Sequence, residues 1–259
     1  MNWGPRAIAL SACVGLLAVS AASAGPAPTH TDIRYSKKHE RSVLDFWQVE
    51  SARPAPLIVY FHGGGFRMGD KGAFRRSALL AEYHPKGVCF ASVNYPFLEH
   101  TGNNHGAILR HTVEAIKFLA SRAKEWNIDT RRIAVSGSSA GALISEYLAY
   151  GSGLPIRAVY ATMQPIGTDL LVLRHIKRGG PPAIVYNASG PSDRIHPASC
   201  ARQVLARCRK VGVYCEIWGT KANGLPTLPA GVSIDTRAMK LIYKAWRLPF
   251  PVKGRQRDE

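Results

Sequence analysis

Gly137-Ser138-Ser139-Ala140-Gly141 is the stretch of this sequence that decides the fold. It fits the pattern G-x-S-x-G, in which a serine is held on a sharp turn between a strand and a helix. The flanking residues have that context, because 132–136 are typical of a strand and 140–149 of a helix. The two glycines lack side chains that would clash in such a turn. Ser139 is therefore a candidate nucleophile, although the pattern also occurs by chance in ordinary loops.

A second glycine-rich stretch, His62-Gly63-Gly64-Gly65-Phe66, follows an apolar strand predicted at residues 56–61. The backbone N–H groups of Gly63, Gly64 and Gly65 can face a developing oxyanion, and the N–H of Ala140 would join them. A plain glycine turn after a strand is the alternative. Two such motifs in this order, each following a strand, favour the oxyanion interpretation.

Strands and helices alternate along the chain. Apolar runs predict strands at residues 56–61, 87–93, 132–136, 156–163, 182–186 and 211–218. Helical spacing predicts helices at residues 73–83, 108–126, 140–149, 198–209 and 236–246. The fold class is therefore α/β, with a mostly parallel central sheet and helices on both faces. Because residues 164–181 form a short connection, any cap over the site is expected to be small or absent.

These motifs resemble the α/β-hydrolase superfamily, in particular its H-G-G-G-bearing carboxylesterases and lipases and the related feruloyl- and acetyl-esterase-like hydrolases. The resemblance rests on residues 61–66 with Gly69-Asp70-Lys71, on Val93-Asn94-Tyr95, and on residues 126–142, and it extends over roughly residues 55–246. It implies hydrolysis of a small-molecule or carbohydrate ester through an acyl-enzyme on Ser139. It implies neither a metal nor another cofactor.

The family places its catalytic carboxylate in the loop after the strand predicted here at residues 182–186. Asp193 lies in that loop. There it would orient the catalytic base and stabilise its charged form. The alternative is a turn aspartate, which is common after Gly-Pro-Ser.

The base is where the sequence departs from the family, which carries a histidine in the loop after the last strand. That loop is Gly-Thr-Lys-Ala-Asn-Gly at residues 219–224, and no histidine follows His196. Lys221 is a poor base, since a lysine ordinarily titrates near about 10.4. His196, three residues after Asp193, is the best substitute, and a surface histidine before a helix is the alternative. Without a base the chain would be a catalytically impaired binding protein on the same fold.

Residues 1–24 have the features of a signal peptide: a positive Arg6, an apolar run, and the cleavage pattern Ala22-Ser23-Ala24. A membrane anchor is the alternative, but the run is shorter than about 18 residues. We therefore expect a secreted or periplasmic protein that does not span the membrane. The remaining chain divides into an N-terminal segment (25–54), the α/β domain (55–247) and a charged tail (248–259).

The chain has 34 Lys and Arg against 17 Asp and Glu, a net charge of +17. Such a balance fits attraction to an anionic surface, or simply a solvated basic face. No basic and aromatic motif for nucleic acid appears.

After the signal peptide four cysteines remain: Cys89, Cys200, Cys208 and Cys215. Cys200 and Cys208 would be about 12 Å apart along a helix, too far for a disulfide. Cys208 with Cys215 is the pairing that the spacing favours. Without a C-x-x-C motif, the sequence predicts no zinc or redox site.

Overall fold

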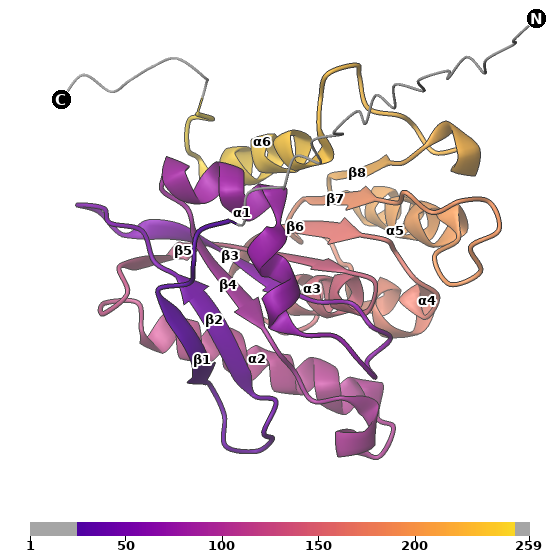
Figure 1. The fold of residues 1–259 in the computed structure, drawn as a ribbon. Coiled ribbons are helices and arrows are strands. Elements are labelled where there is room, and N and C mark those ends of the chain that lie inside the picture. Colours follow the sequence, from indigo (N-terminus) through magenta and orange to yellow (C-terminus); the bar gives the residue numbers. More distant parts are fainter. Residues whose placement is uncertain (1–24, 252–259) are drawn as a thin grey trace, which may run out of the picture.

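The computed structural model describes residues 25–251. The predicted signal peptide and residues 252–259 of the predicted tail lie outside the described residues. One eight-stranded sheet runs through the molecule in the order β1-β2-β4-β3-β5-β6-β7-β8 (Figure 1). The strands β1, β2 and β4 pair antiparallel, and all other neighbours pair parallel. The mostly parallel α/β sheet predicted from the sequence is confirmed.

The strands are β1 (His30–Arg34), β2 (Val43–Trp47), β3 (Ala55–Phe61), β4 (Cys89–Val93), β5 (Ile128–Ser138), β6 (Ile156–Thr162), β7 (Ala183–Tyr186) and β8 (Cys215–Trp218). The helices are α1 (Ala78–Tyr83), α2 (His105–Ser121), α3 (Ala140–Tyr150), α4 (Thr168–Leu171), α5 (Ala198–Val211) and α6 (Ile234–Trp246). Short 3₁₀ helices are η1 (Lys71–Arg76), η2 (His84–Lys86), η3 (Leu98–Thr101), η4 (Leu173–His175) and η5 (Lys221–Asn223).

Two apolar cores lie on the two faces of this sheet. Residues of α2, α3 and α5 pack on one face, and residues of α1 and α6 pack on the other (Figure 1). The inner strands β3 and β4 are buried almost throughout, as expected for a parallel sheet covered on both sides. The N-terminal segment 25–54 supplies β1 and β2, so it belongs to the same sheet as the domain that follows.

Several element boundaries differ from the sequence expectation, and β1 and β2 were not predicted. The helix expected at 108–126 is α2, His105–Ser121. Residues 73–83 form η1 and then α1, with an extended Ser77 between them. α5 continues to Val211 and ends at Gly212, which takes a left-handed conformation with φ 72°, so β8 begins only at Cys215. β5 begins four positions before the expected start, at Ile128. The connection at 164–181 contains only α4 and η4, which agrees with a small or absent cap.

The four cysteines of the described chain are thiols. The Cys208 thiol, in α5, and the Cys215 thiol, at the start of β8, are near enough that each shifts the pKa of the other. Cys89 and Cys200 are buried elsewhere. The pairing favoured by the sequence spacing therefore joins neighbours in space, and its oxidation stays a prediction.

The carboxyl ends of β3, β5, β6 and β7 share one edge of the sheet, because these strands are parallel. Open α/β sheets bind ligands outside the carboxyl ends of their strands. Every candidate site residue named from the sequence lies in a loop or helix start at this edge.

Candidate active site

Ser139 occupies the turn between β5 and α3 in a strained conformation, with φ 55° and ψ −118°. Such a backbone is rare for a residue other than glycine and persists only where the surroundings enforce it. Here the Ser139 N–H donates to the Thr162 carbonyl oxygen over 2.9 Å, at the end of β6. A side chain at Gly141 would clash with the Phe61 carbonyl oxygen, and one at Gly137 with the Gly141 carbonyl oxygen. The turn therefore requires both glycines of the pentapeptide.

Ser139, His196 and Asp193 form one hydrogen-bonded line. The His196 Nε2 atom lies 2.9 Å from the Ser139 Oγ atom. On the other side of the ring, Nδ1 lies 3.0 Å from the Asp193 Oδ2 atom. An ionised Asp193 accepts from Nδ1–H, which leaves Nε2 free to accept the serine proton. This is the nucleophile, base and carboxylate geometry of a catalytic triad, with the histidine supplied by the loop after β7.

A tight turn joins the acid to the base. The Asp193 Oδ1 atom accepts from the backbone N–H groups of Ile195 and His196, each over 2.8 Å. The same carboxylate therefore shapes the turn with one oxygen and orients the imidazole with the other. Hydrogen bonds from the His196 backbone and ring lower the pKa of Asp193 below its ordinary value. The Asp193 and His196 side chains are 26% and 17% exposed, so the pair stays in contact with solvent.

Three polar side chains fix the position of His196, and the sequence analysis did not assign them this role. The His196 carbonyl oxygen accepts from Asn187 Nδ2 over 2.9 Å and from Ser189 Oγ over 2.7 Å. Asn223, in the loop after β8, donates its Nδ2 to the carbonyl oxygens of Asn187 (2.7 Å) and Ser189 (3.1 Å). Asn223 thus stands in the loop where the family carries histidine, and there it ties that loop to the one that holds His196.

The glycine loop after β3 lies against the serine turn. A Cβ atom on Gly63 would come within 3.3 Å of the Ser139 Cβ atom, so these two residues are neighbours. Gly64, with φ 113°, turns the chain, and its carbonyl oxygen accepts from the N–H groups of Arg67 (3.0 Å) and Met68 (3.1 Å). Gly65 faces open space. Of the three glycines, Gly63 is the one that the structure brings directly to Ser139.

Ala140, the fourth predicted oxyanion donor, is the first residue of α3. The first N–H groups of a helix have no acceptor within the helix, so this N–H is available beside Ser139. The positive end of the helix dipole lies at the same place and favours negative charge there. The strand, turn and helix order predicted around Ser139 is confirmed by the fold.

His62 is a structural residue beside the glycine loop. Its ring stacks on Tyr95 with centroids 4.4 Å apart, and Nδ1 bonds to the Gly63 carbonyl oxygen over 2.7 Å. The Tyr95 hydroxyl donates to the His62 carbonyl oxygen over 2.7 Å. Burial lowers the pKa of His62, so the neutral ring is favoured. The ring therefore supports the loop backbone.

A buried ion cluster anchors the segment that follows the glycine loop. Lys71 Nζ lies 2.6 Å from an Asp45 oxygen and 2.8 Å from Asp32, and Arg75 reaches the other Asp45 oxygen over 2.8 Å. Asp45 belongs to β2 and is fully buried. Burial raises the pKa of this carboxyl, but hydrogen bonds from Lys71 and Arg75 outweigh it, and the net direction is downward. The cluster ties η1, and with it the glycine loop, to the sheet.

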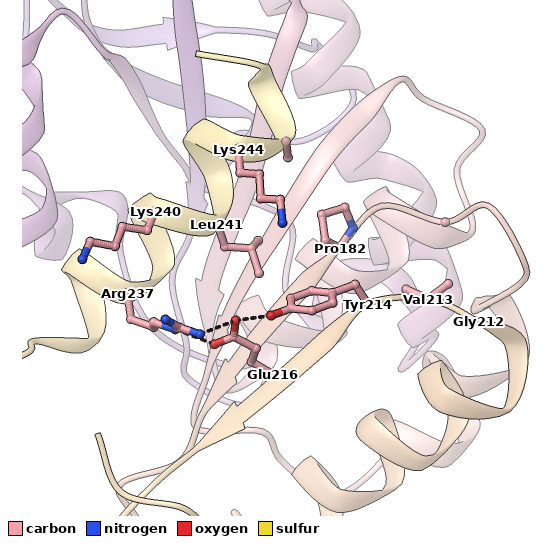
Figure 2. A pocket seen from close by; sticks show the side chains of 11 residues that line it. Pro182, Gly212, Val213, Tyr214, Glu216, Arg237, Lys240, Leu241 and Lys244 are labelled. Carbon is pink, nitrogen blue, oxygen red and sulfur yellow. Dashed lines mark hydrogen bonds and ion pairs between the residues drawn. The ribbon is translucent and has the colours of Figure 1, made fainter. Parts of the chain in front are cut away.

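A cavity of about 530 Å³ lies away from this site. It opens between the starts of β7 and β8 and the helix α6, at the amino ends of these strands (Figure 2). There the Glu216 carboxylate accepts from Arg237 and from the Tyr214 hydroxyl, and the Lys244 side chain extends toward Leu241 and Pro182. Ser139, Asp193 and His196 are not among the residues that line this cavity.

In residues 25–251, no cluster of three or more His, Cys, Asp or Glu side chains has the arrangement needed to hold a metal ion. Within the same residues, every helix is too short or too polar to cross a membrane.

Two kinds of sequence comparison find esterases. A model of the BD-FAE family matches residues 44–156. Esterase LipI of Mycobacterium tuberculosis is 35% identical over 100 residues, which cover 37% of this chain and 29% of the relative. Probable carboxylesterase 6 of Arabidopsis thaliana is 35% identical over 105 residues, covering 38% of this chain and 30% of the relative. The matched part thus spans about three-tenths of the length of these curated relatives.

Solved structures extend the likeness over most of the chain. A truncated carbohydrate esterase from gut microbiota aligns with a TM-score of 0.66 at 14% identity, covering 83% of this chain and 95% of that structure. Native esterase 2 of Thermogutta terrifontis aligns with a TM-score of 0.62 at 18% identity, covering 87% of this chain and 91% of that structure. These likenesses show that the chain shares the fold of the two esterase structures, and the sequence matches relate part of the chain to known esterases.

Proposed function

We propose that the protein is an exported serine hydrolase that cleaves carboxylic or acylated-carbohydrate esters through an acyl-enzyme on Ser139. One observation carries the proposal: Ser139 Oγ, His196 Nε2, His196 Nδ1 and Asp193 Oδ2 are joined by contacts of 2.9 and 3.0 Å. The names of the similar proteins, which include a carbohydrate esterase, an esterase and a probable carboxylesterase, support the same reaction class. Export rests on the signal-peptide pattern of residues 1–24.

The reaction begins when Ser139 Oγ attacks the ester carbonyl carbon and His196 Nε2 takes the serine proton. The carbonyl oxygen becomes an oxyanion, which accepts hydrogen bonds from the Ala140 N–H and from the Gly63–Gly65 loop. When the carbon–oxygen bond to the leaving group breaks, the imidazolium returns its proton to the departing alcohol. Asp193 remains ionised throughout and stabilises the charged ring.

Water completes the cycle. It attacks the acyl-enzyme while His196 again acts as base, and the second oxyanion collapses to release the carboxylic acid and the free Ser139 hydroxyl. The exposure of the Asp193 and His196 side chains lets water reach the base without a large opening motion. Neither half of the reaction needs a metal or a cofactor in this scheme.

A catalytically impaired binding protein is the second candidate, and the missing histidine in the loop after β8 is what favoured it. That argument loses force because His196 Nε2 reaches within 2.9 Å of Ser139 Oγ from a different loop. The role of Asn223 gives a physical reason for the change, since this side chain holds the β7 loop in place. We therefore favour the hydrolase.

Labelling with a fluorophosphonate probe tests the proposal directly. This chemistry suits the site, because esterase 2 of Thermogutta terrifontis has been captured phosphonylated by sarin. We expect the wild type to be labelled and to hydrolyse p-nitrophenyl acetate and butyrate, and Ser139→Ala to do neither. His196→Ala should lower kcat by several orders of magnitude. A low rate should remain, because oxyanion stabilisation does not depend on the histidine. An unlabelled, inactive but folded wild type would contradict the proposal.

A further inference from the structure

Exposed apolar side chains gather at one edge of the molecule. Among the described residues, five large apolar side chains are mostly exposed: Met68 (67%), Ile166 (59%), Leu170 (70%), Ile195 (57%) and Tyr214 (59%). The first four lie in segments that follow the carboxyl ends of β3, β6 and β7, the edge where Ser139 lies, with Leu170 in α4, and Tyr214 lies just before β8, at the opposite end of the strands. We call Met68, Ile166, Leu170 and Ile195 the apolar rim.

Backbone contacts place the rim on both sides of the nucleophile. Met68 belongs to the turn that carries the oxyanion glycines, with its N–H on the Gly64 carbonyl oxygen. Ile195 lies between Asp193 and His196, and its carbonyl oxygen accepts from the Ile166 N–H over 2.8 Å. Figure 1 shows α4 close to the loop that precedes α5. The rim therefore lies at the same edge of the sheet as Ser139.

Core packing does not explain the rim, because these side chains remain mostly exposed. Apolar groups scattered singly over a surface need no explanation, but a group of them gathered around one site marks an interaction surface. A short soluble ester has too little apolar area to cover side chains that lie on both sides of Ser139. An extended apolar phase would cover all four at once.

Positive charge accompanies the rim. Arg67 precedes Met68 and Arg194 precedes Ile195, and both arginines are exposed with no ion pair to any described residue. On the Met68 side, burial and the charge of Arg67 lower the pKa of His105, which keeps that ring neutral. Three exposed acidic residues oppose them: Asp169 beside Leu170, Asp70 two residues after Met68, and Glu99 on η3, while Asp193 is engaged with His196. The whole chain carries +17, which adds a long-range attraction to anions.

We propose that the apolar rim, with Arg67 and Arg194, docks the protein on an anionic phospholipid surface and brings Ser139 to esters held there. Apolar tips enter the boundary of the acyl chains, and the guanidinium groups bind lipid phosphates. Docking on the lipid surface goes beyond the proposed function and does not require it. Only the cleavage of esters at that surface rests on the proposed function of Ser139.

Vesicle co-sedimentation tests the docking apart from the chemistry. The protein used is Ser139→Ala, so that no lipid is hydrolysed, with vesicles of phosphatidylcholine alone or mixed with phosphatidylglycerol. We expect binding to the mixed vesicles that weakens with added salt. Met68→Ser with Ile195→Ser, and separately Arg67→Gln with Arg194→Gln, should each lower the partition coefficient by about tenfold or more.

Two matched variants control for general loss of apolar area and of charge. Tyr214→Ser removes an exposed apolar side chain at the far end of the sheet, and Arg157→Gln removes an exposed arginine at the start of β6. Both should bind mixed vesicles as the parent does. Equal binding by all variants, or no binding by the parent, would overturn the docking. So would rim changes that leave vesicle binding normal in Ser139→Ala but, made in the chain that keeps Ser139, lower kcat/KM on p-nitrophenyl butyrate, which would make the rim an acyl-binding wall. Fluorophosphonate labelling of the Ser139 form reports separately on the proposed function.

Discussion

Asp193 shows how one side chain can define a site at the scale of a residue. One carboxylate oxygen accepts two backbone N–H groups, and the other accepts the ring of His196. Because these donors are placed to bind the ionised form, they lower the pKa of Asp193. The carboxylate therefore remains charged at neutral pH, and it holds His196 in the tautomer that can take the serine proton.

Replacing Asp193 by Asn separates these two tasks. The Asn Oδ1 atom can still accept the backbone N–H groups, so the turn and the fold should survive. The amide now donates to Nδ1, and Nε2 then carries a proton and cannot act as base. We expect kcat to fall by about 10⁴ with p-nitrophenyl butyrate, while thermal unfolding changes little. An active Asp193→Asn enzyme would mean that another group orients His196.

At the scale of elements, the loops after β7 and β8 act as a unit because Asn223 joins them. Its amide group makes two bonds to backbone carbonyls of the β7 loop, and its oxygen accepts from the N–H groups of Thr220 and Leu225. Loss of such a side chain leaves partners without hydrogen bonds, at about 1–3 kcal/mol for each buried group. The position of His196 depends on Asn223 indirectly. Asn223 bonds to Asn187 and Ser189, and the side chains of these two residues bond to His196.

Asn223→Ala should therefore lower both stability and rate. We expect a thermal midpoint several degrees lower and kcat reduced by about 10- to 100-fold, with KM little changed, since a displaced base weakens proton transfer more than binding. Lys221→Ala, in the same loop, is the matched control and should behave as the wild type. If Asn223→Ala kept the full kcat, the bridge would be a stability device alone.

Elements also explain what the sequence predicted and what it left open. The turn at Ser139 and the glycine loop are formed by consecutive residues. Their sequence patterns therefore predicted both the strand ends and the fold. The reach of His196 is not local: it lies 57 positions from Ser139 and depends on Asn187, Ser189 and Asn223. Nothing in the order of the residues shows that the β7 loop folds back onto the nucleophile. For the same reason, the sequence could not choose between a surface histidine and a base.

The contact between α5 and β8 carries a further prediction. The thiols of Cys208 and Cys215 are near enough to shift each other's pKa, so little movement is needed to join them. A disulfide donor such as oxidised glutathione would take up two electrons and two protons and leave a Cys208–Cys215 bond. The short loop that it closes should raise the free energy of unfolding by about 2–3 kcal/mol.

Mass spectrometry and alkylation of the unfolded chain check this prediction. After oxidation the intact mass should be lower by two hydrogen atoms, and only Cys89 and Cys200 should react with iodoacetamide. Cys208→Ser should block both changes, whereas Cys89→Ser should leave the bond intact. Alkylation of all four cysteines after oxidation would contradict the expected pairing.

At the scale of the whole molecule, one buried carboxyl couples stability to pH. Glu146, on α3, is fully buried, and one of its oxygens accepts from Gln164 over 2.7 Å while the other has no partner. Burial raises the pKa of this carboxyl to about 8. In the unfolded chain the pKa of a glutamate is about 4.3. Between these values the folded state binds more protons than the unfolded state, so the free energy of unfolding must fall as pH rises.

Glu146→Gln tests this coupling, because glutamine keeps the shape and stays neutral. Below about pH 4.5 the neutral Glu146 carboxyl makes its full contribution to the free energy of unfolding of the wild type. Above about pH 8 that contribution is lost. In urea unfolding at a series of pH values, the variant should therefore gain on the wild type by up to about 1.4 kcal/mol per pH unit across that window, and level off above it. Glu99→Gln, an exposed carboxylate on η3, should show no such trend. Parallel curves for the wild type and Glu146→Gln would mean that the carboxyl is charged in the folded core.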